Sequence, residues 1–212
     1  MTTLLIATRN AHKVREIGQI MGGGFRCLTL EDFPGAPVAV EDADTFAGNA
    51  RKKVLSLAEW FVKSAAPETP FYIMADDSGL EVDAIGGAPG VHSARFAASD
   101  TSAGNSPDSA NNTKLLHLLA GIPAEKRTAR FRCVLAVLRQ TVPPSPEGII
   151  LFDGVCEGRL SETASGGGGF GYDPLFVPNG YAQSFAELGD DIKNRMSHRA
   201  RALQQLKRHF IK

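Results

Sequence analysis

Residues 45–61 read TFAGNARKKVLSLAEWF. Their apolar side chains return every three or four positions, which is the spacing of one face of an α-helix. Asp44 or Thr45 is placed to cap the start of this helix. Asn49 and Lys53 are four residues apart beside the apolar face, so we expect them to face a shared site. The apolar positions are Phe46, Ala50, Val54, Leu57, Ala58 and Phe61.

Strand patterns lie on both sides of this helix. Residues 3–8 (TLLIAT) predict a short buried strand, and Asn10 then predicts the cap of a helix with Ile17 and Met21 on its inner face. Residues 71–75 (FYIMA) predict a strand that ends in an acidic turn over 76–79. This alternation of strands and helices indicates an α/β fold, and without a strict βαβ repeat we expect a mixed sheet.

The second half of the chain continues this alternation. We expect a helix over 112–120, strands over 129–139 and 148–152, and a glycine loop over 166–169. Ser184 and Glu187 form the spacing of a capping box, and Ser197 is placed to open a last helix.

Composition limits the class of protein. A chain of 212 residues predicts one domain, residues 1–212, with at most two small lobes. Lys plus Arg and Asp plus Glu both number 23, and a net charge of zero argues against a nucleic-acid partner. No apolar run is long enough for a membrane span. The first residues lack the basic flank of a signal peptide, and the three cysteines are widely spaced. We therefore expect a reduced, cytoplasmic protein without a membrane partner.

The first cluster of chemical interest is Thr8, Asn10 and Lys13. It lies where a strand gives way to a helix, and free N–H groups at a helix start attract phosphate. The glycine pattern of a Walker loop is missing. The alternative is an ordinary helix cap followed by a solvated lysine.

The second cluster is the acidic pair Asp76 and Asp77. Adjacent carboxylates are costly unless a cation neutralises them, and their hard oxygens suit Mg²⁺. Because side chains alternate along a strand, we expect only one of them to bind a metal or take a proton from water, and the other to support the loop. Glu41 and Asp44 lie in an acidic loop that can add a carboxylate. The alternative is a solvated turn.

The last two clusters lie near the C-terminus. Phe170 sits among glycines over 166–171 and is placed to stack on a flat ligand, and Asp173 is placed to accept from a ring N–H. The sequence Ser197-His198-Arg199, with Lys193 one turn earlier, provides donors for carbonyl or phosphate oxygens. The alternatives are a flexible hinge and a capping serine with exposed basic neighbours. Together the four clusters match the needs of a nucleoside triphosphate.

Six blocks in this order resemble the inosine triphosphate pyrophosphatase family. The resemblance covers essentially the whole chain and implies a Mg²⁺-dependent hydrolase that converts ITP, dITP and XTP to the monophosphate and pyrophosphate. It also implies an elongated two-lobed α/β fold with a mixed sheet, a cleft between the lobes and a homodimer. The blocks are Thr8-x-Asn10-x-x-Lys13, residues 45–53 (TFAGNARKK), 75–80 (ADDSGL), 86–95 (GGAPGVHSAR), 169–176 (GFGYDPLF) and Ser197-His198-Arg199.

The resemblance also implies roles for individual residues. Asp77 is the expected proton acceptor and a metal ligand, with Glu41 as the second acidic contact to Mg²⁺. Two departures concern this site, because the family usually has an acidic residue where Gly48 stands and small residues where Arg9 and His12 stand. The residues expected around the phosphates are Thr8, Arg9, Asn10, Ala11, His12, Lys13 and Lys53. Those expected around the nucleotide are Ser78, Phe170, Gly171, Tyr172, Asp173, Lys193, His198 and Arg199.

These expectations combine into one hypothesis. Water activated by the metal or by Asp77 attacks the α-phosphorus, and Lys13 and Lys53 stabilise the leaving pyrophosphate. A donor such as Arg199 favours a purine with a carbonyl at its six-position. Two alternatives remain open: a Maf-like pyrophosphatase acting on modified pyrimidine nucleotides, and a nucleotide-binding sensor without hydrolysis.

Overall fold

The computed structural model describes residues 2–64, 72–99, 104–141 and 143–210. In these residues the strands form one six-stranded sheet in the order β2-β1-β3-β4-β5-β6. β1 pairs in parallel with β2 and with β3, whereas β5 and β6 are antiparallel, so the sheet is mixed as predicted. The strands are β1 (Thr2–Ile6), β2 (Phe25–Thr29), β3 (Tyr72–Val82), β4 (Thr128–Arg139), β5 (Ile150–Leu160) and β6 (Phe176–Pro178).

Several of the α-helices begin at a side-chain cap, whereas Pro107 before the helix at Asp108 makes no capping hydrogen bond through its side chain. Asn10 accepts hydrogen bonds from the amides of residues 12 and 13, and Ser184 forms the predicted capping box with Glu187. Thr45 accepts from the amide of Gly48 through its hydroxyl. The helices are α1 (Ala11–Met21), α2 (Phe46–Ser64), α3 (Asp108–Leu118), α4 (Phe185–Met196) and α5 (His198–Phe210). Among the described residues, no helix is both long and apolar enough to cross a membrane.

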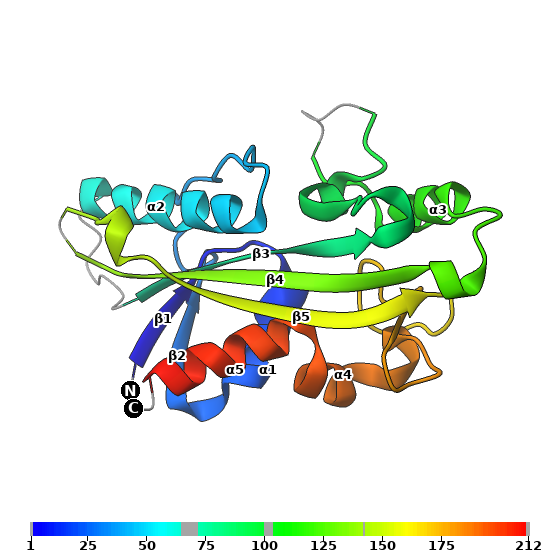
Figure 1. Ribbon diagram of the computed structural model, residues 1–212. Coiled ribbons are helices and arrows are strands. Elements are labelled where there is room, and N and C mark those ends of the chain that lie inside the picture. Colours follow the sequence, from blue (N-terminus) through cyan, green and yellow to red (C-terminus); the bar gives the residue numbers. More distant parts are fainter. Residues whose placement is uncertain (1, 65–71, 100–103, 142, 211–212) are drawn as a thin grey trace. The chain divides into compact units, whose positions relative to one another are not determined.

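The chain divides into two compact units. Unit 1 comprises residues 1–77, 133–154 and 202–212, and unit 2 comprises residues 78–132 and 155–201. Within unit 1, α2 lies on one face of the strands, and α1 with the C-terminal part of α5 lies on the other (Figure 1). The latter face is closed by Ile17 and Met21 of α1 and Leu203 and Leu206 of α5, which pack on alternate residues of the strands.

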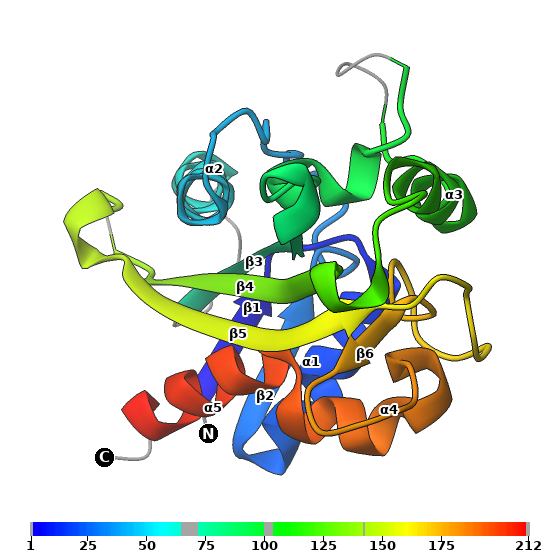
Figure 2. The same cartoon turned by 45° about the vertical axis from the view of Figure 1, so that its right-hand side comes forward.

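Unit 2 has its own apolar core. Leu115 of α3 packs in one buried cluster with Leu80 of β3, Phe131 of β4 and Phe185 of α4. α4 lies beside β6 (Figure 2). Each unit therefore holds its share of the sheet against helices of its own.

Several predicted boundaries are wrong. The strand expected over 71–75 continues to Val82, so the acidic pair lies inside β3 and not in a turn after it; Phe71 is outside the described residues. The helix expected over 112–120 is α3, which begins four residues earlier at Asp108. The strand expected over 148–152 begins at Ile150 and runs on to Leu160.

The central helix matches its prediction. All six apolar positions of residues 45–61 are buried in α2. This face is the one that carries Asn49 inward, with no exposed surface of its own.

Candidate functional site

The alternation of side chains along β3 sends the two acids to opposite faces of the strand. The carboxylate of Asp76 pairs with the ammonium of Lys13 from α1 and accepts from the thiol of Cys133 at 3.2 Å. The carboxylate of Asp77 instead accepts from Lys53 of α2 at 2.7 Å and from the amide of Asn49 at 3.3 Å. The expectation that the acids are not equivalent is confirmed, as is the expectation that Asn49 and Lys53 face one site.

Lys53 joins three groups of unit 1. Its ammonium lies 2.7 Å from Asp77 Oδ1 and 3.0 Å from Glu41 Oε2, and it donates to the backbone carbonyl of Asp76 at 3.2 Å. We call Glu41, Asn49, Lys53 and Asp77 the carboxylate–lysine cluster. It brings together two carboxylates that are 36 residues apart in the sequence.

Burial sets the charge behaviour of this cluster. Removal from water raises the pKa of Asp77 above its ordinary value, although Lys53 and Lys13 oppose the shift. Burial disfavours the charge on Lys53, but Asp77 and Glu41 outweigh it and raise the pKa of that ammonium. A carboxylate with a raised pKa accepts a proton more readily near neutral pH.

The cluster suits a hard divalent cation. Mg²⁺ is usually bound by one or two protein carboxylates, several waters and the phosphates of a substrate. Glu41 and Asp77 provide two such carboxylates, and both of them contact the ammonium of Lys53. Within the described residues, no group of three or more His, Cys, Asp or Glu side chains could hold a metal ion. The two carboxylates by themselves fit the protein's share of a Mg²⁺ site whose other ligands are waters and phosphates.

The geometry around Gly48 explains why this chain has no acid there. A Cβ atom on Gly48 would lie 2.7 Å from the Cβ of Ala43 and 3.0 Å from Thr45 Oγ1. Ala43 is held in place because its amide donates to Asn49 Oδ1 at 2.9 Å. The loop before α2 therefore packs too closely on the helix for any side chain at position 48.

The turn between β1 and α1 is more closed than the sequence suggests. Asn10 Oδ1 accepts from the amides of His12 and Lys13 at 3.0 and 3.1 Å, so these two donors are already used by the cap. Thr8 Oγ1 accepts from the amide of Asn10 at 3.2 Å, and Arg9 donates to the carbonyl of Ala36 at 2.9 Å. Ala11 and the side chain of His12 are exposed. The ammonium of Lys13 is paired with the carboxylate of Asp76.

In unit 2, a second cluster surrounds Phe170. The ammonium of Lys193 lies 2.6 Å from Asp173 Oδ2 and 4.5 Å from the centre of the Phe170 ring. The guanidinium of Arg199 lies 5.8 Å from the same ring centre. We call Phe170, Asp173, Lys193 and Arg199 the Phe170 cluster. Because Lys193, Asp173 and Arg199 are each at most 2% exposed, their charges are held away from bulk water.

Asp173 supports this cluster from inside the turn. Its carboxylate accepts from the amide of Phe170 at 2.9 Å as well as from Lys193. Gly169 has a φ of +70°, and a Cβ there would lie 2.1 Å from Asp173 Oδ2, so the carboxylate occupies the space of a side chain at 169. Asp173 is therefore bonded within the protein, whereas the sequence had suggested an acceptor for a ligand ring N–H.

The remaining expected residues of unit 2 fall into two groups. Ser78 accepts through its hydroxyl from Arg199 at 2.9 Å and lies next to the Phe170 cluster through that bond. The imidazole of His198 is buried and stacks on Phe131, with ring centres 4.8 Å apart. Tyr172 is buried, and its hydroxyl donates to the carbonyl of Ser93 at 2.9 Å. These contacts give His198 and Tyr172 a place in the core of unit 2.

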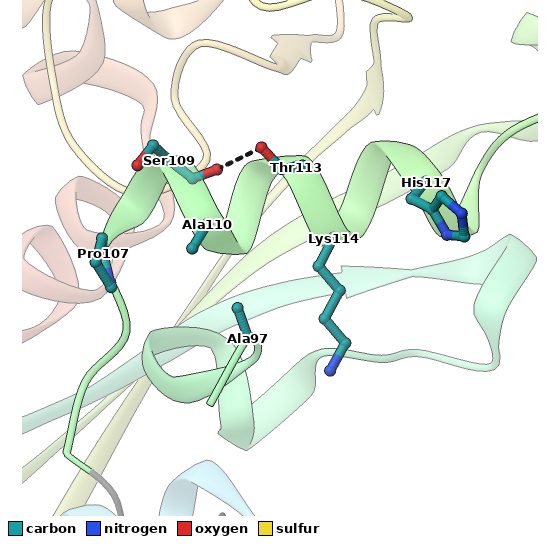
Figure 3. A pocket seen from close by; sticks show the side chains of 7 residues that line it. All are labelled: Ala97, Pro107, Ser109, Ala110, Thr113, Lys114 and His117. Carbon is teal, nitrogen blue, oxygen red and sulfur yellow. Dashed lines mark hydrogen bonds between the residues drawn. The ribbon is translucent and has the colours of Figure 1, made fainter. Parts of the chain in front are cut away.

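A depression of about 580 Å³ lies on the exposed side of α3 (Figure 3). Its lining includes Lys114, but that ammonium donates to the carbonyl of Phe96 at 2.6 Å and lies over the Phe96 ring. The lining shares no residue with either cluster. Its residues are Ala97, Pro107, Ser109, Ala110, Thr113, Lys114 and His117.

Two contacts of Asp76, its pairing with Lys13 and the thiol contact from Cys133, were not predicted from the sequence. The separation of these residues, 63 positions between Lys13 and Asp76, gives no local pattern to find. Only the alternation along the strand hinted that Asp76 faces another partner than Asp77 does.

Comparison with known proteins points in one direction. A family model described as the Ham1 family matches residues 4–209. A dITP/XTP pyrophosphatase of Desulforamulus reducens is 46% identical over 204 residues, which cover 95% of this chain and 92% of that protein. A dITP/XTP pyrophosphatase of Geobacter sulfurreducens is 46% identical over 212 residues, which cover 99% and 97% of the two chains.

Solved structures agree with these relatives. A HAM1 protein from Coxiella burnetii has a TM-score of 0.82 at 30% identity, covering 100% of this chain and 99% of that chain. A nucleoside-triphosphatase / dITP/XTP pyrophosphatase from Mycobacterium abscessus has a TM-score of 0.69 at 34% identity, covering 97% and 98% of the two chains.

Proposed function

Because the chain belongs to the Ham1 family, we propose that it hydrolyses the triphosphates of abnormal purines, ITP, dITP and XTP, to the monophosphate and pyrophosphate. The observation that carries this proposal is the carboxylate–lysine cluster. A buried carboxylate with a raised pKa lies against an ammonium that also contacts a second carboxylate. The names of the relatives supply the nucleotide class.

Asp77 acts as the proton acceptor. It takes a proton from the water that attacks the α-phosphorus; a new P–O bond forms and the bond to the bridging oxygen breaks, so that pyrophosphate leaves. Its burial suits this role, because the raised pKa brings proton affinity closer to neutral pH. Glu41 and Asp77 would hold Mg²⁺, which when bound neutralises phosphate charge and orients the polyphosphate.

The lysines stabilise the charge that develops on the leaving group. Lys13 and Lys53 are both held by carboxylates of the protein before substrate arrives, Lys13 by Asp76 and Lys53 by Asp77. Ammonium groups fixed in advance need little reorganisation during the reaction. The turn from Thr8 to Lys13, with Arg9, Asn10, Ala11 and His12, binds the phosphates.

The Phe170 cluster binds the base. The Phe170 ring stacks on the purine, and Arg199, held by Ser78 beside that ring, donates to the carbonyl at the six-position. An adenine amine at this position would leave a buried guanidinium donor unpaired, which is penalised. Gly171, Tyr172, Asp173, Lys193 and His198 complete the surroundings of the nucleotide.

The test is pyrophosphate release from ITP, XTP, dITP, ATP and GTP, with and without Mg²⁺. We expect release from the first three only, and only with the metal. Rejection of ATP follows from the amine at its six-position, whereas guanine shares the carbonyl there, so that rejection of GTP needs a second feature such as exclusion of its two-amino group. Preferential cleavage of modified pyrimidine nucleotides would favour a Maf-like enzyme instead. Binding of ITP without any pyrophosphate release would indicate a sensor.

A matched pair of variants assigns the chemistry to Asp77. Asp77→Asn should lose activity, whereas Asp42→Asn should keep it, because Asp42 is an exposed acid paired only, among the described contacts, with Lys52. Equal activity of the two variants would remove Asp77 from the mechanism. We further propose that the enzyme works in the cytoplasm as a homodimer and as a single domain of two lobes; gel filtration with light scattering tests the dimer.

A further inference from the structure

Two residues of α3 hold one glycine next to Phe170. The carboxylate of Asp108 accepts from the amide of Gly171 at 2.6 Å. The side-chain amide of Asn112 donates to the carbonyl of the same Gly171 at 3.0 Å. Residues four apart share one face of a helix, so the N-terminal part of α3 hydrogen-bonds both the amide and the carbonyl of this glycine.

These hydrogen bonds matter because the glycines of the turn do not by themselves determine its backbone conformation. Phe170 lies between Gly169, with a φ of +70°, and Gly171, with a φ of +63°. Glycine has access to many backbone conformations, so local preference does not determine where the ring between two glycines points. Hydrogen bonds must therefore hold it. Asp173 binds the amide of Phe170 from within the turn, and the contacts of α3 act on the residue directly after the ring.

We propose that Asp108 and Asn112 are positioning residues for the purine site, holding Gly171 so that the Phe170 ring is presented to the base. This rests on the proposed function, because stacking of Phe170 on a purine is what gives the contact a consequence for the substrate. Neither residue touches the nucleotide in this proposal.

The two contacts differ in strength. Asp108 brings a charged acceptor to a backbone N–H, and charge-assisted hydrogen bonds are about twice as strong as neutral ones. Its charge reaches the turn, because it adds to the effect of burial in raising the pKa of the neighbouring Tyr172. We therefore expect loss of Asp108 to matter more than loss of Asn112.

Kinetics test the proposal. Asp108→Ala should raise KM for ITP about fivefold and Asn112→Ala about threefold, in proportion to one hydrogen bond each, with kcat nearly unchanged. Ser109→Ala and Thr113→Ala are matched controls on the same helix; both residues line the depression (Figure 3), and both variants should leave KM unchanged. An equal rise of KM in the controls, or a fall in kcat without a rise in KM, overturns the proposal.

A double-mutant cycle separates positioning from general destabilisation. If Asp108 acts through Phe170, then Asp108→Ala should add nothing to KM in a Phe170→Ala background. A full fivefold rise in that background overturns the proposal. Asp108→Asn, which keeps a neutral acceptor, should restore part of the normal KM.

Amide hydrogen exchange tests the hydrogen bond from Gly171 to Asp108 directly, without any substrate. Asp108→Ala should speed exchange of the Gly171 amide at least about fivefold, while the amides of β4 exchange as before. Unchanged exchange at Gly171 overturns the proposal. Absence of pyrophosphate release by the unchanged protein would instead refute the proposed function, so the two failures are distinguishable.

Discussion

Lys193→Met is the most demanding test of the Phe170 cluster. It removes an ammonium that lies 2.6 Å from Asp173 Oδ2, with both side chains 2% exposed. Removing one partner of a buried ion pair leaves an uncompensated buried charge and costs about 3–5 kcal/mol. For a protein of this size each kcal/mol lowers Tm by about 2–4 °C, so we expect a loss of about 6–20 °C.

The double variant Lys193→Met/Asp173→Asn provides the control. An asparagine at 173 keeps an acceptor for the amide of Phe170, which the carboxylate now binds at 2.9 Å, but carries no charge. We therefore expect it to recover most of the lost stability, because no unpaired charge is then buried.

Urea unfolding followed by circular dichroism measures both variants, with equal m-values as the condition for comparing them. A cost of less than about 1 kcal/mol for Lys193→Met, which is the range of an exposed ion pair, would contradict a buried pair of this strength. A double variant that is no more stable than the single one would contradict it equally.

Three further predictions concern individual residues. Asp77→Asn should lower pyrophosphate release by about 10²–10⁴-fold. Burial raises the pKa of Asp77 above 3.8, so stability that is present below that pH is lost as pH rises through the raised pKa. With a chelator present, the Tm of Asp77→Asn should therefore rise relative to the Tm of the unchanged protein as pH increases. A Tm difference that stays constant with pH would contradict this. Phe170→Ala should raise KM for ITP about 5- to 150-fold, as expected for the loss of 1–3 kcal/mol of stacking, with a smaller change in kcat; an unchanged KM would show that the ring only packs. Gly48→Ala should displace the loop that carries Glu41, because its Cβ would meet that of Ala43 at 2.7 Å; a Mg²⁺ titration should show a higher requirement, and a normal titration at unchanged Tm would speak against the role of this loop.

The central helix could be predicted because its information is local. The apolar positions of residues 45–61 repeat with the helical period, and each of them is buried in α2. The same pattern placed Asn49 and Lys53 on one side of the helix, and both reach Asp77. Periodicity therefore predicted half of the carboxylate–lysine cluster, including which residues share it.

The course of β3 could not be predicted in this way. Asp76-Asp77-Ser78-Gly79 has the composition of a turn, yet the strand continues to Val82. Two lysines from different helices neutralise the acids from opposite faces, Lys13 for Asp76 and Lys53 for Asp77. Local composition favoured a turn because these long-range partners are invisible in the stretch itself.

A similar reason explains the underestimated length of β5. Gly154 and Gly158 weaken the strand signal after Phe152. In the structure, a Cβ on Gly158 would lie 2.4 Å from the carbonyl oxygen of Val177, in the neighbouring strand β6. The missing side chain of Gly158 allows β6 to approach closely. The glycine is therefore part of the strand pairing, although its composition suggests the end of a strand.

Glycine has the same meaning in both clusters of the candidate site. At Gly169 the missing side chain leaves room for the carboxylate of Asp173, and at Gly48 it leaves room for the loop that carries Glu41. In each case a carboxylate position depends on a side chain that approaches too closely for a Cβ atom, that of Asp173 itself at Gly169 and that of Ala43 at Gly48. Substitution of either glycine should therefore displace a carboxylate several residues away, Asp173 for Gly169 and Glu41 for Gly48. We expect this effect to be larger than the effect on the fold of the unit.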